Sequence, residues 1–163
     1  MIARHIATLG PVGHLRPAPG TWGSAASVLL GLLLAWIGGP YLFILLTLAA
    51  LPLGIWATAE ATRGQDNHDP SEIVIDELLG QWIALWPVVI GAAHVGADLL
   101  ALWPGILTAF VAFRFFDITK FGPIGWADRR SDALGVMLDD AFAGIAAAVV
   151  TVAFAALAHL VLV

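Results

Sequence analysis

Five long apolar stretches leave this chain little length for anything except membrane-embedded segments. They cover residues 25–37, 41–59, 78–93, 99–116 and 141–163. A helix needs about 20 mainly apolar residues to cross a bilayer, within a range of about 17–25. The sequence therefore predicts an all-α integral membrane bundle with about four to five membrane-embedded helices. No repeat or disordered linker interrupts it, so we expect a single domain over residues 1–163.

The composition also indicates a membrane protein. Hydrophobic residues make up 60% of the chain and charged residues only 12%, whereas ordinary soluble domains carry about 25% charged residues. Cysteine is absent, which excludes disulfides, thiolate metal sites and phosphatase mechanisms with a cysteine nucleophile. No apolar segment of adequate length precedes Pro11, so no cleaved signal peptide is expected.

The first two apolar stretches are expected to form a pair. The first stretch is short for a membrane span, and Gly38, Gly39 and Pro40 supply a turn before the second. Two arrangements remain open: residues 25–59 cross the membrane twice, or they form a re-entrant hairpin. In both arrangements the chain returns to the side on which it started.

This topology gathers the basic residues at one membrane face. The segments 1–24, 60–77 and 114–140 then share that face, together with eleven of the twelve acidic residues. The opposite loops and the carboxy terminus hold no Lys or Arg, so the positive-inside rule predicts that the charged face is cytoplasmic. All seven basic residues belong to this face: Arg4, Arg16, Arg63, Arg114, Lys120, Arg129 and Arg130.

Two pairs of adjacent carboxylates belong to the same face, and each is expected just before an apolar helix. The pairs are Asp76 with Glu77, and Asp139 with Asp140. Taken alone, carboxylates at a helix start are favoured by the helix macrodipole, and capping with salt bridging is one explanation of both pairs. Four clustered carboxylates would repel one another without a cation, and Mg²⁺ prefers oxygen ligands. The four residues are therefore candidate Mg²⁺ ligands.

Basic residues near these carboxylates are candidate phosphate ligands. Arg114, Asp117 and Lys120 recur three residues apart, so they share a helical face if the fourth helix continues that far. An Arg114–Asp117 ion pair is one explanation of this spacing. Phosphate binding by Arg114, Lys120 and Arg129 is the other, with Arg as a fork and Lys as a point charge.

Two further polar sites complete the set. Thr21 and Ser24 stand at the start of the first apolar helix, where they are expected to cap it beside free N–H groups that favour an anion. His68 precedes Asp69 and is a candidate general base or acid, because histidine side chains in general can exchange a proton near neutral pH. A loop-stabilising hydrogen bond is the alternative role for His68.

Four polar motifs occur in order, each at a helix entrance. They are APGTWGS at 18–24; HDP at 68–70 followed by IVIDE at 73–77 and Gly80; FRFFD at 113–117 with Lys120, Pro123-Ile124 and Asp128-Arg129; and Gly135 with Asp139-Asp140, Ala143 and Gly144. Together they resemble the phosphatidylglycerophosphatase A family over nearly the whole chain. The resemblance implies a multi-pass, Mg²⁺-dependent phosphatase of the bacterial cytoplasmic (inner) membrane. It would hydrolyse phosphatidylglycerol phosphate to phosphatidylglycerol and inorganic phosphate.

This hypothesis gives each candidate a role. Asp76, Glu77, Asp139 and Asp140 would hold Mg²⁺, and a metal-activated water would attack phosphorus. Asp117 or His68 would orient or deprotonate that water. The candidate catalytic residues are thus Asp117, His68, Asp76 and Asp140, and the candidate phosphate-binding residues are Thr21, Ser24, Arg114, Lys120 and Arg129.

Two other functions remain as alternatives. A small ion-coupled transporter would also carry membrane-embedded charges, but here the polar groups gather at one face, whereas a conducting path needs them across the whole membrane. A lipid-headgroup phosphotransferase would pass phosphate to an alcohol instead of water. We expect a phospholipid substrate and no nucleic-acid partner. The number of metal ions and the oligomeric state stay open.

Overall fold

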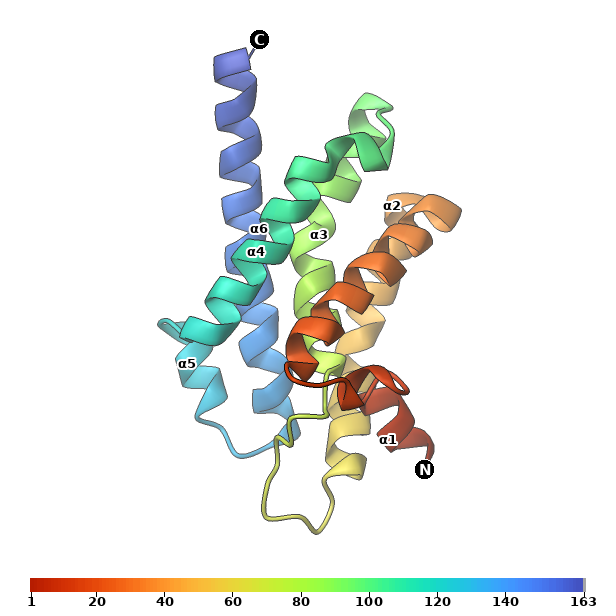
Figure 1. The fold of residues 1–163 in the computed structure, drawn as a ribbon, viewed down its shortest axis with the longest axis vertical. Coiled ribbons are helices and arrows are strands. Elements are labelled where there is room, and N and C mark those ends of the chain that lie inside the picture. Colours follow the sequence, from red (N-terminus) through yellow and green to blue (C-terminus); the bar gives the residue numbers. More distant parts are fainter. Residues whose placement is uncertain (163) are drawn as a thin grey trace.

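The computed structural model describes residues 1–162, and helices make up most of this part of the chain (Figure 1). Four segments are long and apolar enough to cross a membrane: Pro19–Ala61, Ile75–Val95, Leu99–Thr119 and Ala133–Val161. Within residues 1–162 there is no strand, so the predicted all-α membrane fold is confirmed. The elements are α1 (Ile2–Ala7), η1 (Val12–His14), α2 (Pro19–Ala61), α3 (Ile75–Val95), η2 (Leu99–Leu102), α4 (Trp103–Thr119), α5 (Pro123–Asp128) and α6 (Ala133–Leu162).

The long helix α2 is a hairpin of two arms. Its backbone breaks at Gly39, which has φ 68° and ψ −171°, directly before Pro40. The arms run back along each other (Figure 1), and a Cβ added to Gly31 would lie 3.1 Å from the Phe43 ring across the hairpin. The turn predicted at residues 38–40 is therefore confirmed. Each arm has about 20 residues and so a length of about 30 Å, enough to cross the hydrocarbon core.

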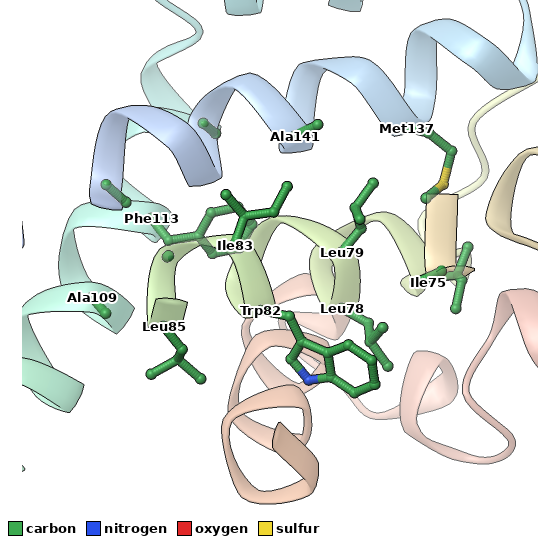
Figure 2. Close-up of a cluster of buried hydrophobic side chains, with 14 of the residues drawn as sticks. Ile75, Leu78, Leu79, Trp82, Ile83, Leu85, Ala109, Phe113, Met137 and Ala141 are labelled. Carbon is green, nitrogen blue, oxygen red and sulfur yellow. The ribbon is translucent and has the colours of Figure 1, made fainter. Parts of the chain in front are cut away.

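Helix α3 forms the centre of the bundle. In its apolar segment 61% of the residues are buried, against at most 28% in the other three long segments. Figure 2 shows Leu79 and Ile83 directed toward α6, while Leu78 and Trp82 point away from α6. Trp82 Nε1 donates a hydrogen bond to the Ser27 carbonyl of α2 at 2.8 Å. The core thus lies on both sides of α3.

The contact between α3 and α6 is a close approach of two backbones. A Cβ added to Gly144 would lie 2.3 Å from the Gly80 carbonyl oxygen, and one added to Gly80 would lie 2.5 Å from the Asp140 carbonyl oxygen. Real Cβ atoms do not come this near to backbone atoms. Gly80 and Gly144 therefore let α3 and α6 approach more closely than larger residues would allow.

The polar segments gather at one end of the bundle, as predicted. In Figure 1 α1, the loop between α2 and α3, and α5 lie at the lower end. The hairpin tip of α2, the connection between α3 and α4, and the C-terminal end lie at the upper end. This arrangement places the amino-terminal parts of α2, α3 and α6 close to the carboxy-terminal end of α4.

Candidate active site

Three carboxylates from two helices form a compact buried cluster. Asp76 and Glu77 lie in the first turn of α3 and Asp140 lies in α6, and one oxygen from each falls within 4.8 Å of the others. Asp76 and Asp140 are buried, and the Glu77 side chain is only 12% exposed. Such a group has the donor type and spacing that hard divalent cations take.

The unpaired oxygens of this cluster fit a cation. Asp76 Oδ1, Glu77 Oε2 and Asp140 Oδ2 are buried without a hydrogen-bond partner among residues 1–162. Buried polar atoms are normally paired, and buried like charges repel one another. A divalent cation would satisfy these oxygens and offset their charge.

Asp76 and Glu77 occupy a helix start that the preceding segment fixes. The Val74 N–H donates to the Ala7 carbonyl at 2.9 Å, which ties the end of the loop to α1. Helix α3 begins at the next residue, Ile75. The predicted position of these two carboxylates at a helix start is thus confirmed, and the macrodipole favours them there.

The second acid pair lies inside its helix, so the prediction that it precedes the helix was wrong. Helix α6 begins at Ala133, because the Asp132 carboxylate accepts a hydrogen bond from the Gly135 N–H at 2.9 Å. The Arg130 guanidinium and that N–H hold the pKa of Asp132 below its usual range. Asp139 and Asp140 therefore lie about two turns inside α6.

Asp139 is engaged by Lys120 and lies outside the three-carboxylate cluster. The Lys120 Nζ donates a hydrogen bond to Asp139 Oδ2 and lies 2.8 Å from Asp128 Oδ1. Partial burial acts to lower the pKa of Lys120, but the hydrogen bonds to Asp128 and Asp139 outweigh it and raise this pKa above its ordinary value. Lys120 thus joins the end of α4 to α5 and α6 as a charged group.

Lys120 does not share a helical face with Arg114 and Asp117, because the condition for it, a fourth helix that continues to residue 120, is not met. Helix α4 ends at Thr119, and Lys120 adopts a left-handed conformation with φ 53°. Its ammonium still lies 3.9 Å from Asp117 Oδ1. The turn of the chain, not helical periodicity, brings Lys120 to the carboxylates.

Arg114 connects α2, α3 and α4 next to the cluster. Its Nη1 lies 2.7 Å from Asp117 Oδ2 and 3.9 Å from Glu77 Oε1, so the ion pair considered from the spacing is present. The same nitrogen donates to the Ser24 hydroxyl at 3.2 Å. Arg114 therefore places a positive charge directly beside the carboxylate cluster.

The start of α2 differs from the predicted capping. The helix begins at Pro19 after Ala18, and no side chain caps it. Ser24 is buried and donates its hydroxyl hydrogen to the Gly20 carbonyl at 2.8 Å, whereas Thr21 is exposed. Proline at the first position needs no partner for an N–H group, which explains why the helix starts earlier than the hydroxyl residues.

Two predicted residues make no hydrogen bond or ion pair with the cluster within residues 1–162. Arg129 follows α5 and is exposed. His68 is half-buried in the loop between α2 and α3, and within residues 1–162 its side chain makes no hydrogen bond or ion pair. The loop hydrogen bond considered as the alternative role of His68 is not made by its side chain; in this loop Asn67 Oδ1 accepts from the Asp69 N–H at 3.0 Å.

Three residues at the site were missed as functional candidates from the sequence. A Cβ on Gly20 would lie 2.3 Å from Glu77 Oε1 and 3.3 Å from the Arg114 guanidinium, so Gly20 lets α2 approach the site. Asp128 pairs with Lys120. Gln81, one turn beyond Glu77, is fully buried with both amide atoms unpaired in the described chain. A single polar side chain within the apolar run LLGQWIALW could have marked Gln81 as a functional candidate.

The comparisons with known proteins agree over nearly the whole chain. Residues 5–155 match the family Phosphatidylglycerophosphatase A. A Haemophilus influenzae protein of that name is 38% identical over 143 residues, covering 86% of this chain and 81% of the relative. An Escherichia coli protein of that name is 30% identical over 147 residues, covering 88% of this chain and 78% of the relative.

A further relative carries a different name. A Bacteroides thetaiotaomicron protein, provisionally named a phosphatidylinositol-3-phosphatase, is 33% identical over 133 residues, covering 78% of this chain and 77% of the relative. No solved structure matches the chain. The match to the family model and the identities of the first two relatives lead to one conclusion: this chain belongs to the phosphatidylglycerophosphatase A family.

Proposed function

We propose that this protein is a Mg²⁺-dependent lipid phosphate monoesterase that hydrolyses phosphatidylglycerol phosphate to phosphatidylglycerol and inorganic phosphate. The names of the two relatives that share its family support the reaction. The buried cluster of Asp76, Glu77 and Asp140 is the observation that carries the metal dependence. In hydrolysis a water oxygen bonds to phosphorus, the ester P–O bond breaks, and the leaving glycerol oxygen takes up a proton.

Asp76, Glu77 and Asp140 would hold Mg²⁺ in this proposal. When bound, Mg²⁺ would neutralise phosphate charge and lower the pKa of a coordinated water. Asp139, assigned to the metal from the sequence, is better suited to orient Lys120, because it already accepts that hydrogen bond. Asp139 would complete the metal site only if it released Lys120.

Arg114 and Lys120 would bind the substrate phosphate. Both lie beside the carboxylates, and both are oriented by Asp117, whose carboxylate oxygens lie 2.7 Å from Arg114 Nη1 and 3.9 Å from Lys120 Nζ. Backbone N–H groups in the first turn of α2, at Gly20 and Thr21, have no intrahelical partner and also favour an anion. Ser24 would act by holding Arg114 in place.

The remaining candidates would attract the substrate or accept a proton. Arg129 is exposed next to the Lys120–Asp128 pair and would contribute long-range attraction for the anionic headgroup. Asp117 or His68 would accept the proton of the attacking water. His68 makes no hydrogen bond or ion pair within residues 1–162, so its imidazole nitrogens are not engaged elsewhere.

The proposed reaction takes place at the cytoplasmic face of the bacterial inner membrane. All seven basic residues belong to segments at the end of the bundle that carries the site. Cytoplasmic loops are enriched in Lys and Arg, which supports this orientation. A labelling experiment with a single cysteine introduced at Gln65, in the loop between α2 and α3, would test it in intact cells.

The central test measures phosphate release from phosphatidylglycerol phosphate by the purified full-length protein. Activity is expected with Mg²⁺, to be lost in EDTA and to return when Mg²⁺ is restored. Metal-independent release, or full activity in Asp76→Asn, contradicts the proposal. Transfer of labelled phosphate to an alcohol in place of water would identify a phosphotransferase, and ion flux in liposomes that requires Asp76 would identify a transporter.

A further inference from the structure

An apolar groove lies between α4 and α6. It encloses about 500 Å³ and is lined by Leu107, Val111, Phe115, Phe116, Val150 and Phe154. The only hydroxyl along it, that of Thr108, donates to the Pro104 carbonyl at 2.8 Å. The groove therefore offers a hydrocarbon surface without a free polar group on its α4 and α6 walls.

One end of the groove lies beside Lys120, whose N–H donates to the carbonyl of the groove residue Phe116 at 2.9 Å. The Phe115 ring, at the groove, lies with its centroid 5.4 Å from that of Phe116 and 6.4 Å from that of Phe121. Phe121 directly follows Lys120, and Phe115 directly follows Arg114. Aromatic rings thus extend from the groove to the residue after Lys120, whereas the Arg114 side chain leaves α4 in another direction, toward Ser24 and Glu77.

The length of the groove matches one leaflet of a bilayer. Leu107 and Phe115 are eight residues apart on α4, which corresponds to about 12 Å along the helix. Half of a typical hydrocarbon core is about 15 Å. A lipid whose phosphate lay at Lys120 could therefore place one chain along the groove without leaving its leaflet.

We infer that this groove holds an acyl chain of the lipid phosphate substrate while Arg114 and Lys120 bind the headgroup phosphate. The inference rests on the proposed function and names how that site selects a membrane lipid over a soluble phosphate ester. The surrounding bilayer is as apolar as the groove, so moving a chain into it yields little hydrophobic free energy. The groove acts by packing and by orienting the ester bond.

The chain offers a matched pair of substitutions for the test. Val111 is 56% exposed and lines this groove; Val149 is 65% exposed and lines a separate groove of about 340 Å³ between α3 and α6. Val111→Trp fills the first groove and Val149→Trp the second. Each places the same bulk on a lipid-facing surface.

The kinetic experiment compares phosphatidylglycerol phosphate with two long acyl chains and with two six-carbon chains in the same detergent. In Val111→Trp the ratio of kcat/KM for the long-chain over the short-chain substrate should fall about five- to tenfold. In Val149→Trp the ratio should stay at the wild-type value. An unchanged ratio in Val111→Trp, or an equal fall in both variants, overturns the inference.

Photolabelling of the wild-type protein provides a measurement that does not depend on a folded variant. A non-hydrolysable phosphonate analogue with a diazirine in its acyl chain should label peptides of α4 and α6 that contain Val111 or Val150. Equal labelling by a phosphatidylcholine probe means that bulk lipid fills the groove, and overturns the inference. Absence of phosphate release from both chain lengths in the wild type instead contradicts the proposed function, which separates the two failures.

Discussion

Asp139 and Asp140 are neighbours in the chain, but their carboxylates have different partners. Asp139 accepts a hydrogen bond from Lys120, whereas Asp140 joins Asp76 and Glu77. Successive residues of a helix point about 100° apart, so one turn of α6 can serve two different surroundings. A pair that reads as one acidic motif in the sequence therefore contributes to two parts of the proposed site.

This division predicts different effects for the two amide substitutions. Asp140→Asn should raise the Mg²⁺ concentration for half-maximal activity by at least about tenfold, because it removes a proposed ligand. Asp139→Asn should leave that concentration nearly unchanged and lower kcat/KM by about tenfold, because Lys120 loses an orienting partner. A Mg²⁺ titration of phosphate release checks both. Equal shifts in the two variants would show that both carboxylates bind the metal.

Gly20 should be required for activity more than for stability. A Cβ there would meet the flexible end of Glu77, which can move aside, but the movement displaces a proposed ligand and the adjoining Arg114. We expect Gly20→Ala to lower kcat/KM by about tenfold or more while the thermal unfolding temperature changes little. Gly91→Ala is the matched control, since nothing lies within 4 Å of a Cβ at that helical position. Loss of activity in both variants would argue against a local effect.

Gly144 should be required for stability. A Cβ there would lie 2.3 Å from the Gly80 carbonyl oxygen, and a backbone atom within α3 cannot move aside alone. Overpacking of this kind costs about 1–3 kcal/mol, so Gly144→Ala should lower the unfolding temperature measured in detergent. Gly91→Ala again serves as the control. An unfolding temperature equal to that of the wild type would mean that α3 and α6 separate without cost.

Lys120 should remain charged throughout an ordinary assay range. Its folded-state pKa is raised, so the stability from its ion pairs is fully present below the unfolded pKa, ordinarily 10.5, and is lost only as pH rises through the folded value. Lys120→Met should therefore lower the unfolding temperature at every pH between about 7 and about 9 by a similar amount. A difference from the wild type that disappears as pH approaches 9 would contradict a raised pKa. Unfolding curves at several pH values distinguish the two outcomes.

Much of the architecture could be predicted from the sequence, because a membrane limits the choices. The apolar stretches predicted the helices, the Gly38–Pro40 turn predicted the hairpin, and alternation of segments placed the polar residues at one end of the bundle. The Arg114–Asp117 pair also followed from helical spacing. These features depend on local sequence and on chain topology, both of which the printed sequence contains.

Features that depend on contacts between helices were not predictable in the same way. The wrong start of α6 came from taking Asp139 as the boundary, although Asp132 forms the hydrogen bond at the helix start. Similarly, Pro19 starts α2 before the hydroxyl residues. Which carboxylates Lys120 meets depends on its own left-handed backbone conformation at the end of α4. Neither periodicity nor composition specifies which side chains meet once the helices pack.

The glycine crossing between α3 and α6 has a mechanical consequence. Gly80 lies three residues after Glu77 and Gly144 four residues after Asp140, so the crossing is about one turn from the carboxylates. A bilayer that becomes thicker or thinner changes the tilt of its helices. Rotation about a fixed contact moves the distant helix ends most and the atoms near the pivot least. The spacing of the carboxylates should therefore vary little between membranes of different thickness, even where the far ends of the helices shift.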